Sequence, residues 1–203
     1  MGLDQTLYVN SKQAAKDSKR WHEENGYDGR LFDGSERSGW FAYWRKANHI
    51  HAWFEKELAD GELQCGPMYA VGLETIEKLR DTCKTVLGSS NLVDGERTVV
   101  AWKWDNAAGK MVEDNHTVNG RFLEDSSVAE GLLPRSEGFF FGSQMYDDDY
   151  YDDTKYTFDL CNFILENMAQ WRTEYNGEPM YDWHPIWPGD EDWYVDFNYY
   201  ASW

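Results

Sequence analysis

The run YDDDYYDDTKYTFDLCNFILENMAQW (residues 146–171) decides the fold predicted for this chain. Its large apolar side chains recur every three or four residues, which is the period of an α-helix with one buried face. The members of this stripe are Tyr156, Leu160, Phe163, Ile164, Met168 and Trp171. The carboxylates at the start of the run suit the positive end of a helix dipole. We therefore expect a long helix here, with its apolar stripe in the core.

Two further stretches have the same helical period. Residues 38–58 are expected to form a helix that stops at Gly61, and a second helix is expected to end at Gly88. The apolar stripe of the first is Tyr43, Ala47, Ile50 and Phe54, and that of the second is Ile76, Leu79, Cys83, Val86 and Leu87. Residues 11–20 are polar and contain a local cluster of Lys and Arg, so we interpret them as a surface excursion.

Short segments rich in β-branched and aromatic residues predict strands. They are residues 3–9, 68–71, 138–143 and 193–203, with a hairpin formed by 97–104 and 110–118. Helices interleaved with short strands, two of them in a hairpin, favour an α+β fold. We expect about three helices packed on one face of a mainly antiparallel sheet.

The length of 203 residues suits one domain, because a single core can still grow at this size. Residues 1–203 are therefore taken as a single domain, with insertions at 89–130 and 173–192. The second insertion has no period and predicts an irregular loop. The chain holds 11 Trp, 13 Tyr and 10 Phe, so aromatic rings must fill much of the interior.

The charge balance is strongly acidic, with 19 Lys and Arg against 37 Asp and Glu, a net charge of −18 and a pI near 4.5. A field of this sign repels phosphate backbones and anionic lipids, so direct binding to nucleic acid or to a membrane is disfavoured. The same field attracts basic partners, and many basic surfaces belong to proteins that bind nucleic acids. The alternative is that the charge serves solubility alone.

The three cysteines are far apart and odd in number, and the first residues lack a basic segment followed by an apolar one. We expect reduced thiols and a location in the cytoplasm. The acidic run lacks the glycine and glutamate spacing of an EF-hand, and no zinc spacing occurs. No metal and no cofactor are therefore predicted.

A small-molecule pocket is one hypothesis for the 38–58 helix. Trp44, Arg45, Asn48 and His51 can stack on a ring, pair with an anion and read a polar edge, which suits a nucleotide. Candidate residues for the opposite wall are Ser143, Tyr146 and Asp147. The alternative is that Asn48 and His51 bond to backbone groups and that the glycines around residues 139–141 serve turns.

The aspartates at the start of the 146–171 run suggest a second site. Carboxylates interleaved with tyrosine imitate the charge spacing of a phosphate backbone and could occupy a basic groove on another protein. The candidate contacts are Asp148, Asp149, Tyr150, Asp152 and Asp153. The alternative is a solvated helix start.

Catalysis has little support in the sequence. No Ser or Cys lies in a nucleophile elbow, and no His-x-x-x-His pair occurs on a helix. An enzyme is therefore less expected than a binding protein, and a hydrolase that uses His51 with nearby acids is the third choice. No catalytic residue is assigned.

Several pieces together resemble a family of small phage and prophage proteins of unassigned function. They are MGLD (1–4), YWRKAN (43–48) with IH (50–51) and WF (53–54), CG (65–66), GFFFGS (138–143), YD (146–147) and SW (202–203). The label of phosphoglycerate kinase sometimes attached to such proteins has no support, because the chain has no phosphate-cradling glycine-rich loop. The resemblance implies a mobile-element origin but does not imply an activity.

Together, the negative net charge and the resemblance favour a phage-type accessory protein. Such a protein would bind and inhibit a basic host protein, such as a nucleic-acid-handling or defence complex. A nucleotide-binding sponge is the alternative.

Overall fold

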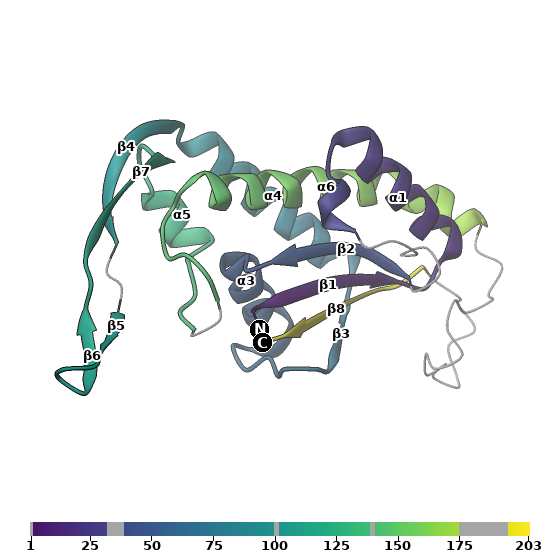
Figure 1. Cartoon of the computed structure of the whole chain (residues 1–203). Helices are drawn as coiled ribbons and strands as arrows, with labels where there is room; N and C mark the ends of the chain where they lie inside the picture. The colour runs from purple at the N-terminus through teal and green to yellow at the C-terminus, as the bar shows by residue number, and fades with distance from the viewer. Residues whose placement is uncertain (1, 32–38, 100–101, 139–140, 175–194) are drawn as a thin grey trace.

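The computed structural model describes residues 2–31, 39–99, 102–138, 141–174 and 195–203. It confirms the α+β fold, with antiparallel strands and five α-helices among the described residues instead of about three (Figure 1). The elements are β1 (Asp4–Val9), α1 (Lys12–Asn25), η1 (Asp28–Arg30), β2 (Trp40–Arg45), α3 (Asn48–Ala59), β3 (Met68–Val71), α4 (Leu73–Ser89), β4 (Leu92–Val99), β5 (Trp102–Asp105), β6 (Lys110–Glu113), β7 (His116–Leu123), α5 (Ser127–Leu132), α6 (Asp148–Glu174) and β8 (Phe197–Ser202).

The main sheet has the strand order β2-β1-β8-β3, and every neighbouring pair is antiparallel. The first and last strands of the chain are therefore partners, with Asp4 opposite Ser202 and Leu7 opposite Tyr199. The two ends of the chain lie close together, where β1 starts and β8 ends (Figure 1). A β-bulge lies between Leu7 and Tyr8, where β1 pairs with β2.

One face of the sheet is covered by helices, with α1 and α6 on the same side (Figure 1). Along β8 the alternate residues Phe197, Tyr199 and Ala201 are buried, which is the period expected of a strand with one face in the core. The ring of Phe41 in β2 packs edge to face against Phe197, with 4.9 Å between ring centres, and against Trp171 of α6, with 5.7 Å between ring centres. The predicted stripe of the 146–171 run is thus confirmed as the core face of α6.

Hydrogen bonds pair the polar groups that this aromatic core buries. The Tyr199 hydroxyl donates to Gln5 at 2.9 Å, and the Gln5 amide donates to the Ala47 carbonyl at 3.1 Å. The Trp171 indole donates to Asp17 at 3.0 Å, and the Trp44 indole donates to Thr157 at 2.9 Å. Since an unpaired buried polar group destabilises a fold, these bonds fix how α1, α3 and α6 lie on the sheet.

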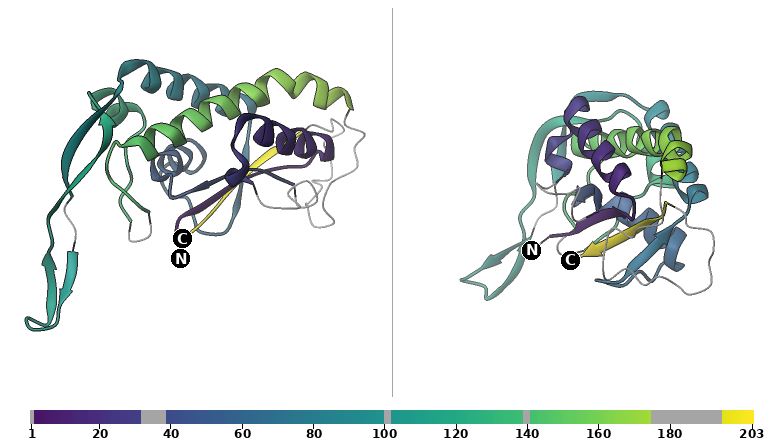
Figure 2. Two further views of the ribbon diagram at one scale, coloured as in Figure 1. Left: turned by 45° about the horizontal axis from the view of Figure 1, so that its top comes forward. Right: turned by 90° about the vertical axis from the view of Figure 1, so that its right-hand side faces the viewer.

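A long two-stranded ribbon projects from the body of the protein (Figure 2). Strands β4 and β7 pair along eight positions, from Leu92 opposite Leu123 to Val99 opposite His116, and β5 pairs with β6 farther out. The ribbon confirms the predicted hairpin and extends it at both ends. It lies inside the segment 89–130 that was interpreted as an insertion.

The prediction of one helix over residues 38–58 is wrong in its first half. Trp40–Arg45 form β2 and only Asn48–Ala59 form α3. The aromatic residues that mimic a helical stripe alternate along a strand, and Lys46 adopts a positive φ of 60° that ends the strand before the helix begins. Tyr43 therefore does not share a helix face with Ile50.

Two other predictions are also corrected. Residues 12–25 form a helix and not a surface excursion, because the buried face uses small and polar residues, among them Ala14, Ala15 and Ser18. Of the predicted strand 138–143, the described residues 138 and 141–143 lie in no strand, and the Phe141 amide donates to the Gly138 carbonyl at 3.1 Å. The predicted irregular loop overlaps the end of α6 at residues 173–174, and the rest of it lies outside the described residues.

Three buried histidines predict a loss of stability in mild acid. Burial lowers the pKa of His22 to about 4 and of His51 to about 4, and it lowers the pKa of His49 well below its ordinary value. In the unfolded chain each histidine takes up a proton near pH 6.5, whereas the folded chain resists it. Above pH 6.5 these groups therefore contribute no pH dependence. Between pH 6.5 and 4 the free energy of unfolding should fall, by about 1.4 kcal/mol per histidine at pH 5.5.

Urea unfolding at pH 7.0 and pH 5.5 measures this effect. The variant His51→Gln should show a smaller difference between the two pH values than the original chain. The control His116→Gln, at an exposed ribbon position, should leave the difference unchanged. An equal pH difference in all three proteins would contradict the assignment to buried histidines.

Candidate functional site

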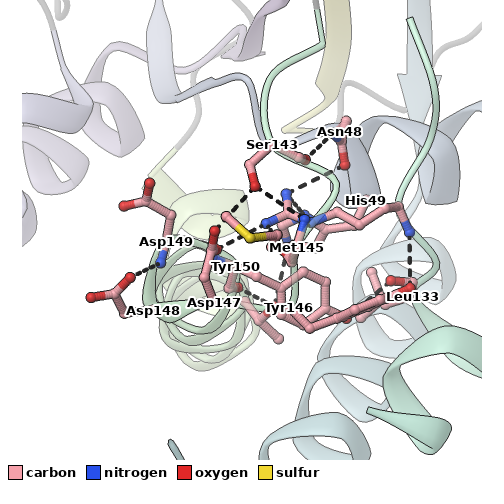
Figure 3. Close-up of polar contacts among 12 residues, drawn as sticks. Asn48, His49, Leu133, Ser143, Met145, Tyr146, Asp147, Asp148, Asp149 and Tyr150 are labelled. Carbon is pink, nitrogen blue, oxygen red and sulfur yellow. Dashed lines mark hydrogen bonds and ion pairs between the residues drawn. The ribbon is translucent and has the colours of Figure 1, made fainter. Parts of the chain in front are cut away.

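A polar cluster joins the start of α3, the loop before α6 and the start of α6 (Figure 3). We call it the junction cluster, and its members are Asn48, Arg135, Ser143, Met145, Asp147 and Tyr150. The Asp147 carboxylate accepts the backbone N–H of Tyr150 at 3.0 Å, which caps the first turn of α6. The same carboxylate accepts the Ser143 hydroxyl at 3.1 Å and the Arg135 guanidinium at 3.2 Å.

Arg135 lies at the centre of the junction cluster. Its side chain is only 5% exposed, and it donates from Nε and Nη2 to the Met145 carbonyl at 2.9 and 2.6 Å. Its guanidinium also lies 4.9 Å from the centre of the Tyr150 ring. Burial lowers the pKa of Arg135, and the charge of Asp147 opposes that shift. These contacts use most of the donors of the guanidinium, so Arg135 holds the loop before α6 in place.

Asn48 connects the same loop to α3. Its amide donates to the carbonyls of Phe141 and Ser143 at 3.1 and 3.0 Å. Its side-chain oxygen accepts a long bond of 3.4 Å from Arg135. Asn48 therefore has the backbone-bonding role that the sequence left open as an alternative.

The structure separates the predicted ligand residues into two groups. Asn48, Ser143, Tyr146 and Asp147 come together in or beside the junction cluster, and the Tyr146 hydroxyl accepts the Arg135 backbone N–H at 3.3 Å. Trp44 and His51 lie in the core instead.

His51 bonds the Tyr199 hydroxyl at 2.9 Å and packs against Phe141 and Trp203. Trp44, in turn, bonds Thr157 of α6. Trp44 thus connects β2 to α6, and His51 connects α3 to β8. Neither side chain lines the hollow that adjoins the cluster.

A hollow of about 390 Å³ adjoins the junction cluster, and we call it the α6 hollow. Its lining residues are Gly29, Arg30, Tyr43, Arg45, Lys46, Arg135, Ser143, Asp149, Asp152 and Asp153. Arg45 and Lys46 are exposed, whereas Arg30 pairs with Asp153. Sequence reasoning found Arg45 and Ser143 but missed Arg30, Lys46 and Arg135. Lys46 follows Arg45 directly and could have been included, whereas isolated arginines give no local signal.

The start of α6 presents only some of the predicted acidic contacts. Asp148, Asp149 and Asp152 are exposed, whereas Tyr150 and Asp153 are buried. The helical period turns the last two inward, where the Tyr150 hydroxyl donates to the Leu133 carbonyl at 2.9 Å. Burial raises the pKa of Asp153, and its pairing with Arg30 opposes that rise. Tyr150 and Asp153 therefore do not lie on the acidic surface that the sequence suggested.

An acidic depression of about 520 Å³ lies between the ribbon base and the start of α6. Its charged lining residues are Asp94, Glu96, Arg121 and Asp148. Two backbone contacts attach the ribbon here. The Leu123 N–H donates to the Tyr146 carbonyl at 2.8 Å, and an isolated antiparallel β-bridge pairs Phe122 with Asp147. The acids of α6 and those of the ribbon thus share one surface, which sequence separation had hidden.

The outer part of the ribbon exposes two large apolar side chains. Trp104 is 59% exposed and Met111 is 48% exposed. They are opposite one another in the β5–β6 pairing, so they form one apolar surface on the same side of the ribbon.

Comparison of the chain with family models, curated proteins and solved structures finds no match. In the described part of the chain no helix combines the length and apolar character needed to cross a membrane. Among the same residues, no three His, Cys, Asp or Glu side chains gather as the ligands of a metal ion would.

The junction cluster predicts strong energetic coupling between Arg135 and Asp147. Arg135→Leu or Asp147→Asn should each lower the free energy of unfolding by about 3 kcal/mol, because each leaves a buried partner unpaired. The double variant should lose less than the sum, by about 1 kcal/mol or more. Urea unfolding of the four proteins measures this coupling.

The exposed pair of Lys103 and Asp114 on the ribbon is the matched control. Lys103→Ala should leave the free energy of unfolding nearly unchanged, because water screens an exposed ion pair. Purely additive losses for Arg135 and Asp147 would contradict the coupling.

Proposed function

We propose that this chain is a phage-type accessory protein that binds a basic host protein and thereby inhibits it. The observation that supports this best is the shared acidic surface, in which Asp94 and Glu96 of the ribbon lie beside Asp148 of α6. The proposal requires no catalytic residue and no cofactor.

Charge provides the first step of recognition. The net charge of −18 attracts a basic surface from a distance, and the acidic depression gives that attraction a defined place. Asp149 and Asp152 extend the acidic surface along the exposed side of α6. A basic groove that normally holds nucleic acid would meet carboxylates in place of phosphates, so binding would compete with the natural ligand.

The ribbon provides the second step, which is short-range contact. Its charges are nearly balanced, with Arg97, Lys103, Lys110 and Arg121 among several carboxylates, so contact along the ribbon depends less on charge than contact with the acidic body does. Exposed Trp and Met side chains are enriched at protein interfaces because they bury large apolar area. An isolated two-stranded ribbon is marginally stable, and packing of the Trp104 surface on a partner would support it.

Capture of proteins from a host lysate with matched variants tests the proposal. The original chain should retain a protein of high pI, and its association rate should fall as salt rises. The triple variant Asp148→Asn, Asp149→Asn, Asp152→Asn should associate at least fivefold more slowly, because it removes charge at the binding surface. The variant Trp104→Ser, Met111→Ser should mainly increase the dissociation rate.

A variant with the same change in net charge is the control. Glu74→Gln, Glu77→Gln, Asp81→Asn neutralises three exposed acids of α4, away from the acidic depression. It should associate nearly as fast as the original chain. Equal slowing in both triple variants would show that only the overall charge matters. Equal affinity in all variants would overturn the proposed surface.

A further inference from the structure

The face of the main sheet that points away from α6 carries a group of aromatic side chains. Tyr8, Trp40, Tyr43 and Tyr200 are all partly exposed, and they alternate with the core residues of β1, β2 and β8. Tyr43 and Tyr200 are the two cross-strand partners of Thr6, so one ring lies on each side of it. Neighbouring rings are close, with 5.8 Å between Tyr8 and Trp40 and 6.3 Å between Tyr8 and Tyr200.

These rings line a hollow of about 340 Å³, which we call the sheet hollow. Its lining residues are Asp4, Thr6, Tyr8, Trp40, Tyr43, Arg45, Tyr200 and Ser202. The rings supply flat apolar surface, and the hydroxyl groups supply donors and acceptors around it. Such a mixture suits a planar heterocycle better than an aliphatic chain.

The sheet hollow adjoins the α6 hollow, because Tyr43 and Arg45 line both. Arg45 lies two residues beyond Tyr43 on β2, which corresponds to about 7 Å along the strand. Lys46 follows at the turn, where its side chain lies over Gly142. Among the described residues, neither Arg45 nor Lys46 lies within ion-pair distance of a carboxylate, although Asp4 is the cross-strand partner of Arg45 and also lines the sheet hollow. Two cations therefore border an aromatic surface.

We propose that the two hollows together bind a nucleoside monophosphate. The phosphate pairs with Arg45 and Lys46, since guanidinium and ammonium groups are the usual phosphate ligands. The base lies against the rings of Tyr43, Tyr200 and Tyr8, because aromatic side chains stack on any base. This binding site shares no lining residue with the acidic depression, although Asp149 and Asp152 of the acidic α6 surface also line the α6 hollow. The proposed nucleotide site does not depend on the proposed protein partner.

The charges around the α6 hollow favour one phosphate over a longer anion. Asp153 pairs with Arg30 and Asp147 pairs with Arg135, which leaves Asp149 and Asp152 facing the hollow from α6. A second or third phosphate would approach these carboxylates and be repelled. The net charge of the chain likewise disfavours a nucleic acid strand.

Calorimetric titration of the full chain with the four ribonucleoside monophosphates tests the site. At least one should bind with a dissociation constant of about 10–100 µM. The corresponding nucleoside and inorganic phosphate should each bind at least tenfold more weakly, because each occupies only one hollow. Absence of nucleotide binding up to millimolar concentration would overturn the proposal. Equal binding of inorganic phosphate, or tighter binding of a ten-residue single-stranded RNA, would also overturn it.

Variants assign the two halves of the ligand. Arg45→Ala should weaken nucleotide binding about tenfold while leaving nucleoside binding unchanged. Tyr200→Leu should weaken both nucleotide and nucleoside binding and leave phosphate binding unchanged. Lys56→Ala removes an exposed cation of α3 that does not line either hollow, and it should bind like the original chain.

Thermal melts of each variant show whether a loss of binding comes from unfolding. The variant Arg45→Lys keeps the positive charge and should bind the nucleotide more tightly than Arg45→Ala does. Unchanged nucleotide affinity in Arg45→Ala would contradict the assignment of the phosphate. Unchanged nucleoside affinity in Tyr200→Leu would contradict the assignment of the base.

Discussion

The carboxylate of Asp147 makes the contacts on which the arrangement around the start of α6 depends. It caps α6 through the Tyr150 N–H and it also pairs with Arg135. The side chain of Asp147 is only 11% exposed, so water cannot easily replace these contacts. The loop before α6, the start of α6 and the base of the ribbon must therefore keep the relative positions that allow all of these contacts. One buried ion pair with its hydrogen bonds thus fixes how the projecting ribbon is attached to the sheet and helices.

Two candidate binding surfaces lie close to this attachment. In one, Asp148 of α6 lies beside Asp94 and Glu96 of the ribbon and forms the acidic depression. In the other, Arg45 and Lys46 line the α6 hollow, and Arg45 also lines the sheet hollow. The two proposals therefore assign a basic protein and a small anion to different hollows of a strongly acidic chain. The protein-binding function and the nucleotide site are independent proposals that share the same structural support.

Much of the fold could be predicted from local patterns, and the site could be predicted only in part. The stripe of α6 and the alternation of β8 are set by periodic burial, which a single sequence shows directly. The spacing of the aromatic residues in 40–45 fits both the helical and the strand period, so the sequence alone predicts a helix there. Pairing with β1, which is a long-range contact, makes this segment a strand. The candidate residues Arg45, Ser143 and Asp148 were found, because they lie in conspicuous runs. Arg30 and Arg135 were missed, since only tertiary contacts bring them to the α6 hollow.

Hydrogen exchange at the amides of Tyr150 and Leu123 tests most directly whether one cluster holds both α6 and the ribbon. The Tyr150 amide bonds the Asp147 carboxylate, and the Leu123 amide bonds the Tyr146 carbonyl at the ribbon base. In Asp147→Ala, both amides should exchange faster, by about tenfold or more for a loss of 1.4 kcal/mol, while core amides of β1 and β8 keep their protection. Faster exchange at Tyr150 alone, with Leu123 unchanged, would contradict the claim that this carboxylate couples the ribbon to the body.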